Sequence, residues 1–318
     1  MSRYVIRRLL LIIPTLFVIS VVIFAMIRIA PGDPGVVYLS RGGPTEIDPQ
    51  ELAEFREEHG LNRPLVAQYG SWLWGLARFE GGISLWSSKP VFEEISTALP
   101  ATVELAILST LIALLIAVPA GLISAINRDS VWDYGFRMFG ISGLAMPDFF
   151  TGSMLLVILV IFFQWIPPLE YHGFFENPIA NLGQMIWPAL ILGHIQAALI
   201  SRMIRSTTLE VLQQDYVRTA RAKGLRNSMV YLRHAFRNAL LPVVTVAGVQ
   251  FGQVLGGAVI VENIFAIPGI GFKLLDAVRH KDYVLLQTIV VLFALAILLV
   301  NLVVDLLYGL LDPRIRYS

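Results

Sequence analysis

The sequence is dominated by long runs of apolar residues that carry almost no charge. The first, residues 9–27, contains no charged side chain, and comparable runs recur to the end of the chain. A helix of about 20 apolar residues spans the hydrocarbon core of a bilayer. The chain is 56% hydrophobic and 15% charged, whereas typical soluble domains carry about a quarter charged residues. These runs therefore predict an all-α polytopic membrane protein.

We expect about six transmembrane helices, because each apolar run is long enough to cross a bilayer. They lie at about residues 9–27, 105–126, 138–163, 185–204, 238–261 and 283–304. The third is broken at Pro147-Asp148, and the sixth continues toward Leu311. The first run is longer than the apolar region of a signal peptide and lacks a clear cleavage site after it, so we interpret it as an uncleaved span.

The charges between these runs predict an orientation. Residues 30–100 carry more acids than bases, whereas residues 202–237 carry many arginines and lysines with only Glu210 and Asp215 as acids. Cytoplasmic loops are enriched in Lys and Arg. We therefore expect the basic segment and both termini to be cytoplasmic, and residues 30–100 to lie outside.

The basic segment also has a helical pattern. Tyr216, Val217 and Ala220 recur at helical spacing, and Gly224 follows as a helix stop. A loop that is basic only to set topology needs charge but no such pattern. We therefore favour a folded element over that alternative.

Two predicted helix starts flank this element. Thr207 and Glu210 have capping-box spacing, which predicts the start of a helix leading into the basic segment. Asn227 or Ser228 is suited to cap a second helix after Gly224.

The basic segment resembles the cytoplasmic loop of ABC importer permeases. That loop reads Glu-Ala-Ala, three residues, Gly, a spacer and an Ile-x-Leu-Pro-like end; the corresponding positions here are Arg218-Thr219-Ala220, Gly224 and Ala239-Leu240-Leu241-Pro242. The first two residues of the pattern are replaced and the spacer is longer. In both departures the sequence resembles the peptide/nickel branch of the family, whose members contain segments similar to YVRTARAKGL and RNALLPVVTV. The stretches HGLNRPLVAQYGSWLWGLARFEGGISL and ENIFAIPGIGFKLLDAVRHKDYVLLQ extend the resemblance over essentially the whole chain.

The resemblance implies a type I (MetI-like) ABC importer permease with an extra N-terminal helix. Residues 1–100 would form that helix and an extracytoplasmic segment, and residues 101–318 the five-helix transmembrane domain with a coupling loop at about 205–240. The ATPase would dock on that loop. The docking residues would be Tyr216, Val217, Arg218, Thr219, Ala220, Arg221, Ala222, Lys223 and Gly224. The outer loop that resembles that of peptide-type permeases would contain Glu262, Pro268, Gly269 and Gly271.

The resemblance also implies the partners and the cargo. These are a second, homologous permease, two cytoplasmic ATPase subunits that bind ATP and Mg, an extracytoplasmic binding protein, and the cytoplasmic (inner) membrane of a prokaryote. The expected cargo is a di- or oligopeptide; nickel chelates and oligosaccharides are the alternatives. This chain itself would bind no cofactor, metal or nucleic acid.

Several polar or small residues lie within the predicted spans. Asp148 is either part of a translocation path or a helix-terminus carboxylate at a proline break, since a membrane-embedded charge must face protein or water. Gln250 and Gln253 either line the path or pack against neighbours. Gly248, Gly252 and Gly256 recur every four residues on one face, which favours close helix packing.

The sequence contains no motif for chemistry of its own. It lacks a G-x-x-x-x-G-K-[ST] phosphate loop, an HExxH motif and any cysteine. We therefore expect a transport subunit and no enzyme. A stand-alone secondary carrier is the alternative class, but it predicts repeated embedded charges and inverted repeats, and Asp148 is the only clear deep charge.

Overall fold

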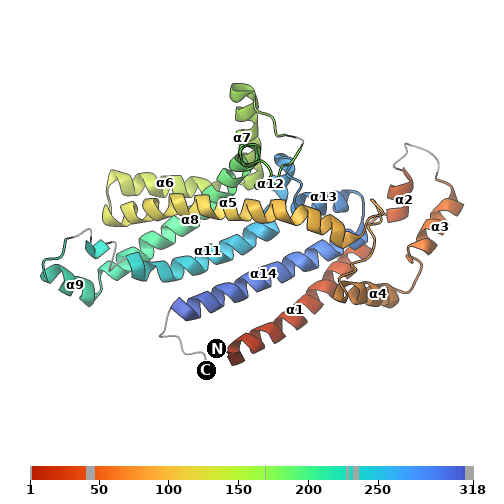
Figure 1. The fold of residues 1–318 in the computed structure, drawn as a ribbon, viewed down its shortest axis with the longest axis horizontal. Coiled ribbons are helices and arrows are strands. Elements are labelled where there is room, and N and C mark those ends of the chain that lie inside the picture. The colour runs from red at the N-terminus through yellow and green to blue at the C-terminus, as the bar shows by residue number, and fades with distance from the viewer. Residues whose placement is uncertain (1, 41–46, 169, 227–228, 232–235, 312–318) are drawn as a thin grey trace. The chain divides into compact units, whose positions relative to one another are not determined.

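The computed structural model describes residues 2–40, 47–168, 170–226, 229–231 and 236–311. In these residues the regular structure is helical, apart from one bridge between Ile83 and Pro90. The all-α prediction is therefore confirmed (Figure 1). The helices are α1 (Ser2–Ile29), α2 (Pro34–Leu39), α3 (Pro49–Glu58), α4 (Leu65–Ala77), α5 (Val91–Ile126), α6 (Val131–Ala145), α7 (Asp148–Phe163), α8 (Pro178–Leu212), α9 (Asp215–Ala222), α11 (Arg237–Gly257), α12 (Val259–Ile264), α13 (Ile270–Arg279) and α14 (Tyr283–Leu311).

The chain forms two compact units. The first comprises Met1–Thr102 and Pro268–Leu298, and the second comprises Val103–Ile267 and Leu299–Ser318. Helices α5 and α14 each contribute to both units.

The first unit is held together by apolar contacts among α1, α4, α13 and the parts of α5 and α14 that belong to it. Val91, Ile95 and Ala98 of α5 pack with Ile270 and Ile289. Trp72 of α4 is buried and donates from Nε1 to Thr288 Oγ1 at 3.1 Å. Burial of such apolar and aromatic surface is the main force that fixes these helices.

The second unit is built on α8, which packs against α6 and α11. Its core contains Ala113 and Ala117 of α5, Ile200 and Ile204 of α8, and Val243 of α11. Small residues allow these backbones to approach closely. A Cβ at Gly121 would lie 2.7 Å from the Ser201 carbonyl oxygen, and one at Gly193 would lie 2.9 Å from the Ser109 carbonyl oxygen.

Four helices are long and apolar enough to cross a membrane: Val5–Ile29, Val91–Ile126, Pro178–Leu212 and Tyr283–Leu307. A fifth span arises if α6 and α7 count as one broken span. The apolar part of α11, Pro242–Gly256, is shorter. Each of the six predicted runs is thus helical, although they differ in length and continuity.

The predicted break at Pro147-Asp148 is present, and it bends the chain by 103°. Met146 and Pro147 both have extended backbone conformations, with ψ of 131° and 146°. The residue before a proline disfavours helical φ and ψ angles. Two extended residues in succession therefore change the direction of the chain. The third predicted span is therefore two helices at a sharp angle.

One predicted helix start is wrong, and one helix extends beyond its predicted span. Thr207 does not begin a helix, because α8 continues to Leu212 and the Thr207 hydroxyl donates to the Met203 carbonyl at 2.8 Å. The next residue, Thr208, is fully buried. Helix α5 begins at Val91, well before the predicted start at residue 105, and runs through Pro100.

Candidate coupling site

Helix α9 ends in the way the sequence predicts. Gly224 has φ of +76°, a left-handed conformation that costs glycine little. Its amide donates to the Arg221 carbonyl at 3.0 Å, and the Leu225 amide donates to the Ala220 carbonyl at 3.4 Å. These two bonds form a Schellman motif, which closes the helix C-terminus.

One face of α9 is buried against the end of α8. Val217 is fully buried and Ala220 nearly so, and with Val230 they form a small cluster that also contacts Val211, Leu212 and Leu225. An isolated helix of 8 residues is not stable in water. The cluster therefore holds α9 in place.

The opposite face of α9 is exposed and basic. Arg218, Arg221 and Lys223 are exposed, and so are Thr219 and Ala222. The Arg218 guanidinium lies 3.7 Å from Asp215, but both side chains are more than four-fifths exposed, so this pair contributes little. The face carries a net positive charge and is suited to an acidic partner surface.

The nine residues predicted for docking therefore divide into two groups. Val217 and Ala220 face inward and position the helix, whereas Tyr216 and the basic residues face outward. The predicted second helix start, Asn227 or Ser228, lies outside the described residues.

Gly248 and Gly252 of α11 pack against α14. A Cβ at Gly248 would lie 2.1 Å from Cγ2 of Val304, and one at Gly252 would lie 3.3 Å from Cγ1 of Val300. Gly256, on the same helix, is half-buried. Close packing explains the first two glycines.

The polar candidates of the spans occupy different environments. Gln250 is buried and Gln253 is exposed, although they lie three residues apart on α11. Asp148 is half-buried in the first turn of α7. In the described part of the chain its carboxylate has no ion-pair partner. The structure does not bring Asp148, Gln250 and Gln253 into one cluster.

The residues of the predicted outer loop fall in both units. In the second unit, Glu262 is fully buried in α12 and its carbonyl accepts from the Ile267 amide at 2.8 Å. In the first unit, Pro268 and Gly269 precede α13, and Gly271 is buried in its first turn. The Ile270 amide donates to Thr102 Oγ1 at 2.8 Å, which fixes the start of α13.

A buried ion pair was missed by the sequence analysis. Arg205 of α8 donates from Nε and Nη2 to the two carboxylate oxygens of Asp133 on α6, at 2.8 and 2.7 Å. The Ser124 hydroxyl and the Asp129 amide also donate to this fully buried carboxylate. Asp133 stands three residues after the N-cap Ser130, so its sequence position indicates only a helix start.

Most of the chain matches the models of one protein family. Residues 117–317 match the binding-protein-dependent transport system inner membrane component, and residues 1–106 match its N-terminal region. The chain belongs to this family. It is 39% identical to the dipeptide transport system permease protein DppB of Escherichia coli K12 and 41% identical to the di/tripeptide transport system permease protein DppB of Pseudomonas aeruginosa. A putative peptide transport system permease of Brucella abortus is 35% identical; each comparison covers all of both chains.

Membership of the binding-protein-dependent permease family confirms the predicted class. The chain is a multi-pass inner-membrane permease of an ABC importer and a non-catalytic transport subunit. The family also implies ATPase and binding-protein partners.

Proposed function

We propose that this permease imports di- or oligopeptides. The support is the full-length similarity to permeases of dipeptide, di/tripeptide and peptide transport systems. A second, homologous permease would complete the translocation path, two cytoplasmic ATPase subunits would bind ATP and Mg, and one extracytoplasmic binding protein would deliver cargo. Residues 1–100 would form the N-terminal helix and outer segment, and residues 101–318 the transmembrane domain, with both termini cytoplasmic.

Helix α9 would couple ATP hydrolysis to transport. The observation that carries this proposal is the attachment of α9: its buried face is fixed to the end of α8, while its basic face is exposed. Helix α8 is continuous over 35 residues and has Pro188 inside it, a position that favours bending. A displacement of α9 would therefore move the part of α8 that follows Pro188. Closure of the ATPase dimer would thus bias the spans between inward- and outward-open states, provided that the ATPase binds α9 differently in the two states.

The Gly224→Asp variant tests the coupling role. No described residue lies within 4 Å of a Cβ at Gly224, although its φ of +76° strains any residue other than glycine. We therefore expect a side chain there to obstruct the partner, and the Asp and Asn variants share the backbone strain. We expect normal membrane insertion, lost copurification of the ATPase subunits and no uptake. Gly224→Asn is the matched variant, because Asn tolerates the left-handed conformation and adds no charge. Normal uptake by both variants would overturn the proposal.

The cargo is tested separately with purified complexes in liposomes. With the cognate binding protein present, we expect dipeptides and short peptides to stimulate ATP hydrolysis, and nickel chelates and oligosaccharides to have no effect. Stimulation by either alternative cargo would contradict the peptide assignment and leave the coupling role intact.

A further inference from the structure

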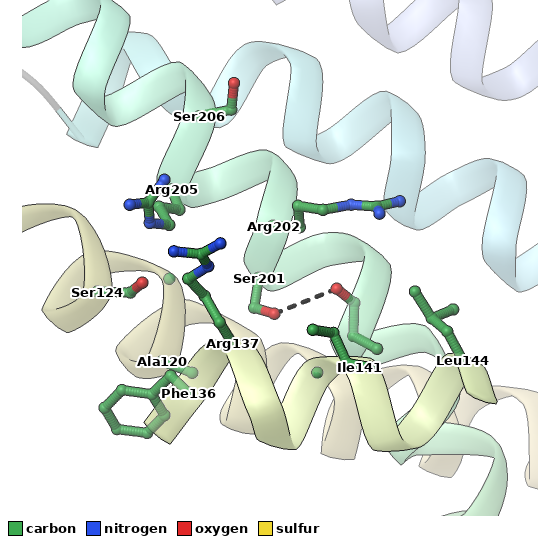
Figure 2. Close-up of a pocket in the computed structure, with 13 residues that line it drawn as sticks. Ala120, Ser124, Phe136, Arg137, Ile141, Leu144, Ser201, Arg202, Arg205 and Ser206 are labelled. Carbon is green, nitrogen blue, oxygen red and sulfur yellow. Dashed lines mark hydrogen bonds between the residues drawn. The ribbon is translucent and has the colours of Figure 1, made fainter. Parts of the chain in front are cut away.

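A basic cavity lies among α5, α6 and α8, close to the end of α8 that leads into α9. Its volume is about 460 Å³. Figure 2 shows Arg137 of α6 reaching toward Arg205 of α8, whereas the side chain of Arg202, one turn away on α8, extends away from this pair along another part of the lining. Hydroxyl groups complete the polar lining: Ser124, Ser201 and Ser206.

The glycine contacts explain why a cavity forms here. Gly121 and Gly143 allow the backbones of α5 and α6 to lie against α8: a Cβ at Gly121 would meet the Ser201 carbonyl at 2.7 Å, and one at Gly143 would lie 3.3 Å from the His194 carbonyl. Helices α6 and α8 carry long arginine side chains near these contacts. The arginines therefore surround a space that the small residues leave open.

The cavity has an excess of positive charge. Arg205 is neutralised and held in place by the buried Asp133. Arg137 and Arg202 are exposed and have no carboxylate partner among the described residues; Arg137 lies over the Tyr134 ring at 5.6 Å. The hydroxyls of Ser124 and Ser201 already donate to Asp133 and to the Ala198 carbonyl. The donors left for a ligand are therefore those of the arginines, and Arg presents a planar set of donors to phosphate oxygens.

An apolar groove continues from this cavity. It has a volume of about 530 Å³ and is lined by Ile116, Pro119, Trp132, Gly135 and Phe139. Ala120 and Phe136 line both the groove and the basic cavity. Trp132 is 68% exposed, as suits a side chain at the level of lipid headgroups. A free phosphate would fill only the basic cavity, whereas an amphipathic phosphate ester would fill both spaces.

We propose that this site binds an anionic phospholipid, with its phosphate in the cavity lined by Arg137, Arg202 and Arg205 and an acyl chain along the groove beside Gly135. Basic pockets between transmembrane helices are suited to such headgroups. The bound lipid would hold α6 against α8 about two turns before the end of α8, to which α9 is attached.

The test is lipid retention by the purified complex. Complexes are delipidated, exposed to vesicles of phosphatidylglycerol or phosphatidylcholine, re-extracted in mild detergent and analysed by native mass spectrometry. We expect retention of phosphatidylglycerol only. The double variant R137Q/R202Q is expected to weaken retention roughly thirtyfold, since each basic side chain near an anionic surface contributes about a factor of five. Arg128→Gln, which alters an exposed arginine paired with Asp129, is the matched control.

Gly135→Leu tests the groove without disturbing the permease. Among the residues that the structure describes, none lies within 4 Å of a Cβ at Gly135, and the same holds for the control position Gly183 on α8. We expect Gly135→Leu to abolish lipid retention and Gly183→Leu to leave it unchanged. Equal retention by R137Q/R202Q, or by Gly135→Leu, would overturn the proposal. So would loss of the second permease subunit from the Gly135→Leu complex, because the groove would then be a protein interface.

Free phosphate is the other source of the same chemistry. Inorganic phosphate added at millimolar concentration is expected not to displace the lipid. Displacement by phosphate, with no effect of Gly135→Leu, would assign the basic cavity to a soluble anion and overturn the lipid assignment.

Discussion

A Cβ added at Gly248 would lie 2.1 Å from Cγ2 of Val304, closer than two non-bonded carbon atoms can approach. Val304 is β-branched and therefore stiff, so a methyl group at position 248 forces α11 away from α14. Gly248→Ala is expected to destabilise the permease by about 1–3 kcal/mol, as overpacking does. The measurement is the thermal unfolding midpoint in detergent.

The control for this prediction is Gly183→Ala on α8, where the added Cβ meets no described residue within 4 Å. There the change is expected to be neutral, or to stabilise by up to about 1 kcal/mol through helix propensity. Equal midpoints for the two variants would show that the α11–α14 contact is looser than the structure indicates.

The Asp133–Arg205 pair predicts an asymmetry between its two partners. Arg205→Gln leaves a fully buried carboxylate without its cation, whereas Asp133→Asn leaves an arginine side chain that is 22% exposed. Breaking a buried pair by removing one partner costs about 3–5 kcal/mol, and we expect the larger loss for Arg205→Gln. The double variant R205Q/D133N is expected to recover part of it. Membrane expression level and the unfolding midpoint measure this; a double variant worse than either single one would contradict it.

The exposed face of α9 predicts a salt-dependent association. Arg218→Glu combined with Arg221→Glu is expected to abolish ATPase copurification in low salt, because the two side chains are exposed and would repel an acidic groove. Lys89→Glu, an exposed charge reversal in the first unit, is the control. Unchanged association of the α9 variant would exclude an electrostatic contact at this face.

Val217 and Arg218 are neighbours in sequence with opposite expected effects. Val217 is fully buried in the cluster that anchors α9, so Val217→Asp is expected to detach the helix and expose the loop to protease. The Arg218→Glu change should leave the protease pattern unchanged while weakening ATPase binding. Limited proteolysis of both variants distinguishes anchoring from docking.

Asp148 tests the proposed translocation path. As a path residue, Asp148→Asn is expected to raise KM for uptake several-fold while ATPase association stays normal. Its carboxylate also lies in the first turn of α7, where a negative charge stabilises a helix by about 0.3–1 kcal/mol. A lower unfolding midpoint with unchanged KM would show that Asp148 only stabilises the start of α7.

Local patterns in the sequence were sufficient for the class of protein, the apolar helices and the end of α9. A run of about 20 apolar residues has one stable form in a bilayer. Gly224 likewise ends α9 because only the four or five residues around it are needed to form the closing hydrogen bonds.

Only the tertiary structure decided where local signals compete with packing. The capping-box pattern at Thr207 did not start a helix, because burial of Ile204 and Thr208 favours one continuous α8. Pro147 predicted a break but not its 103° angle. Asp133 and Arg205 are 72 residues apart in sequence, and no local rule pairs them. Their contact, and the basic cavity beside it, exist because small residues let α5 and α6 approach α8, and that approach is a property of the packed helices together.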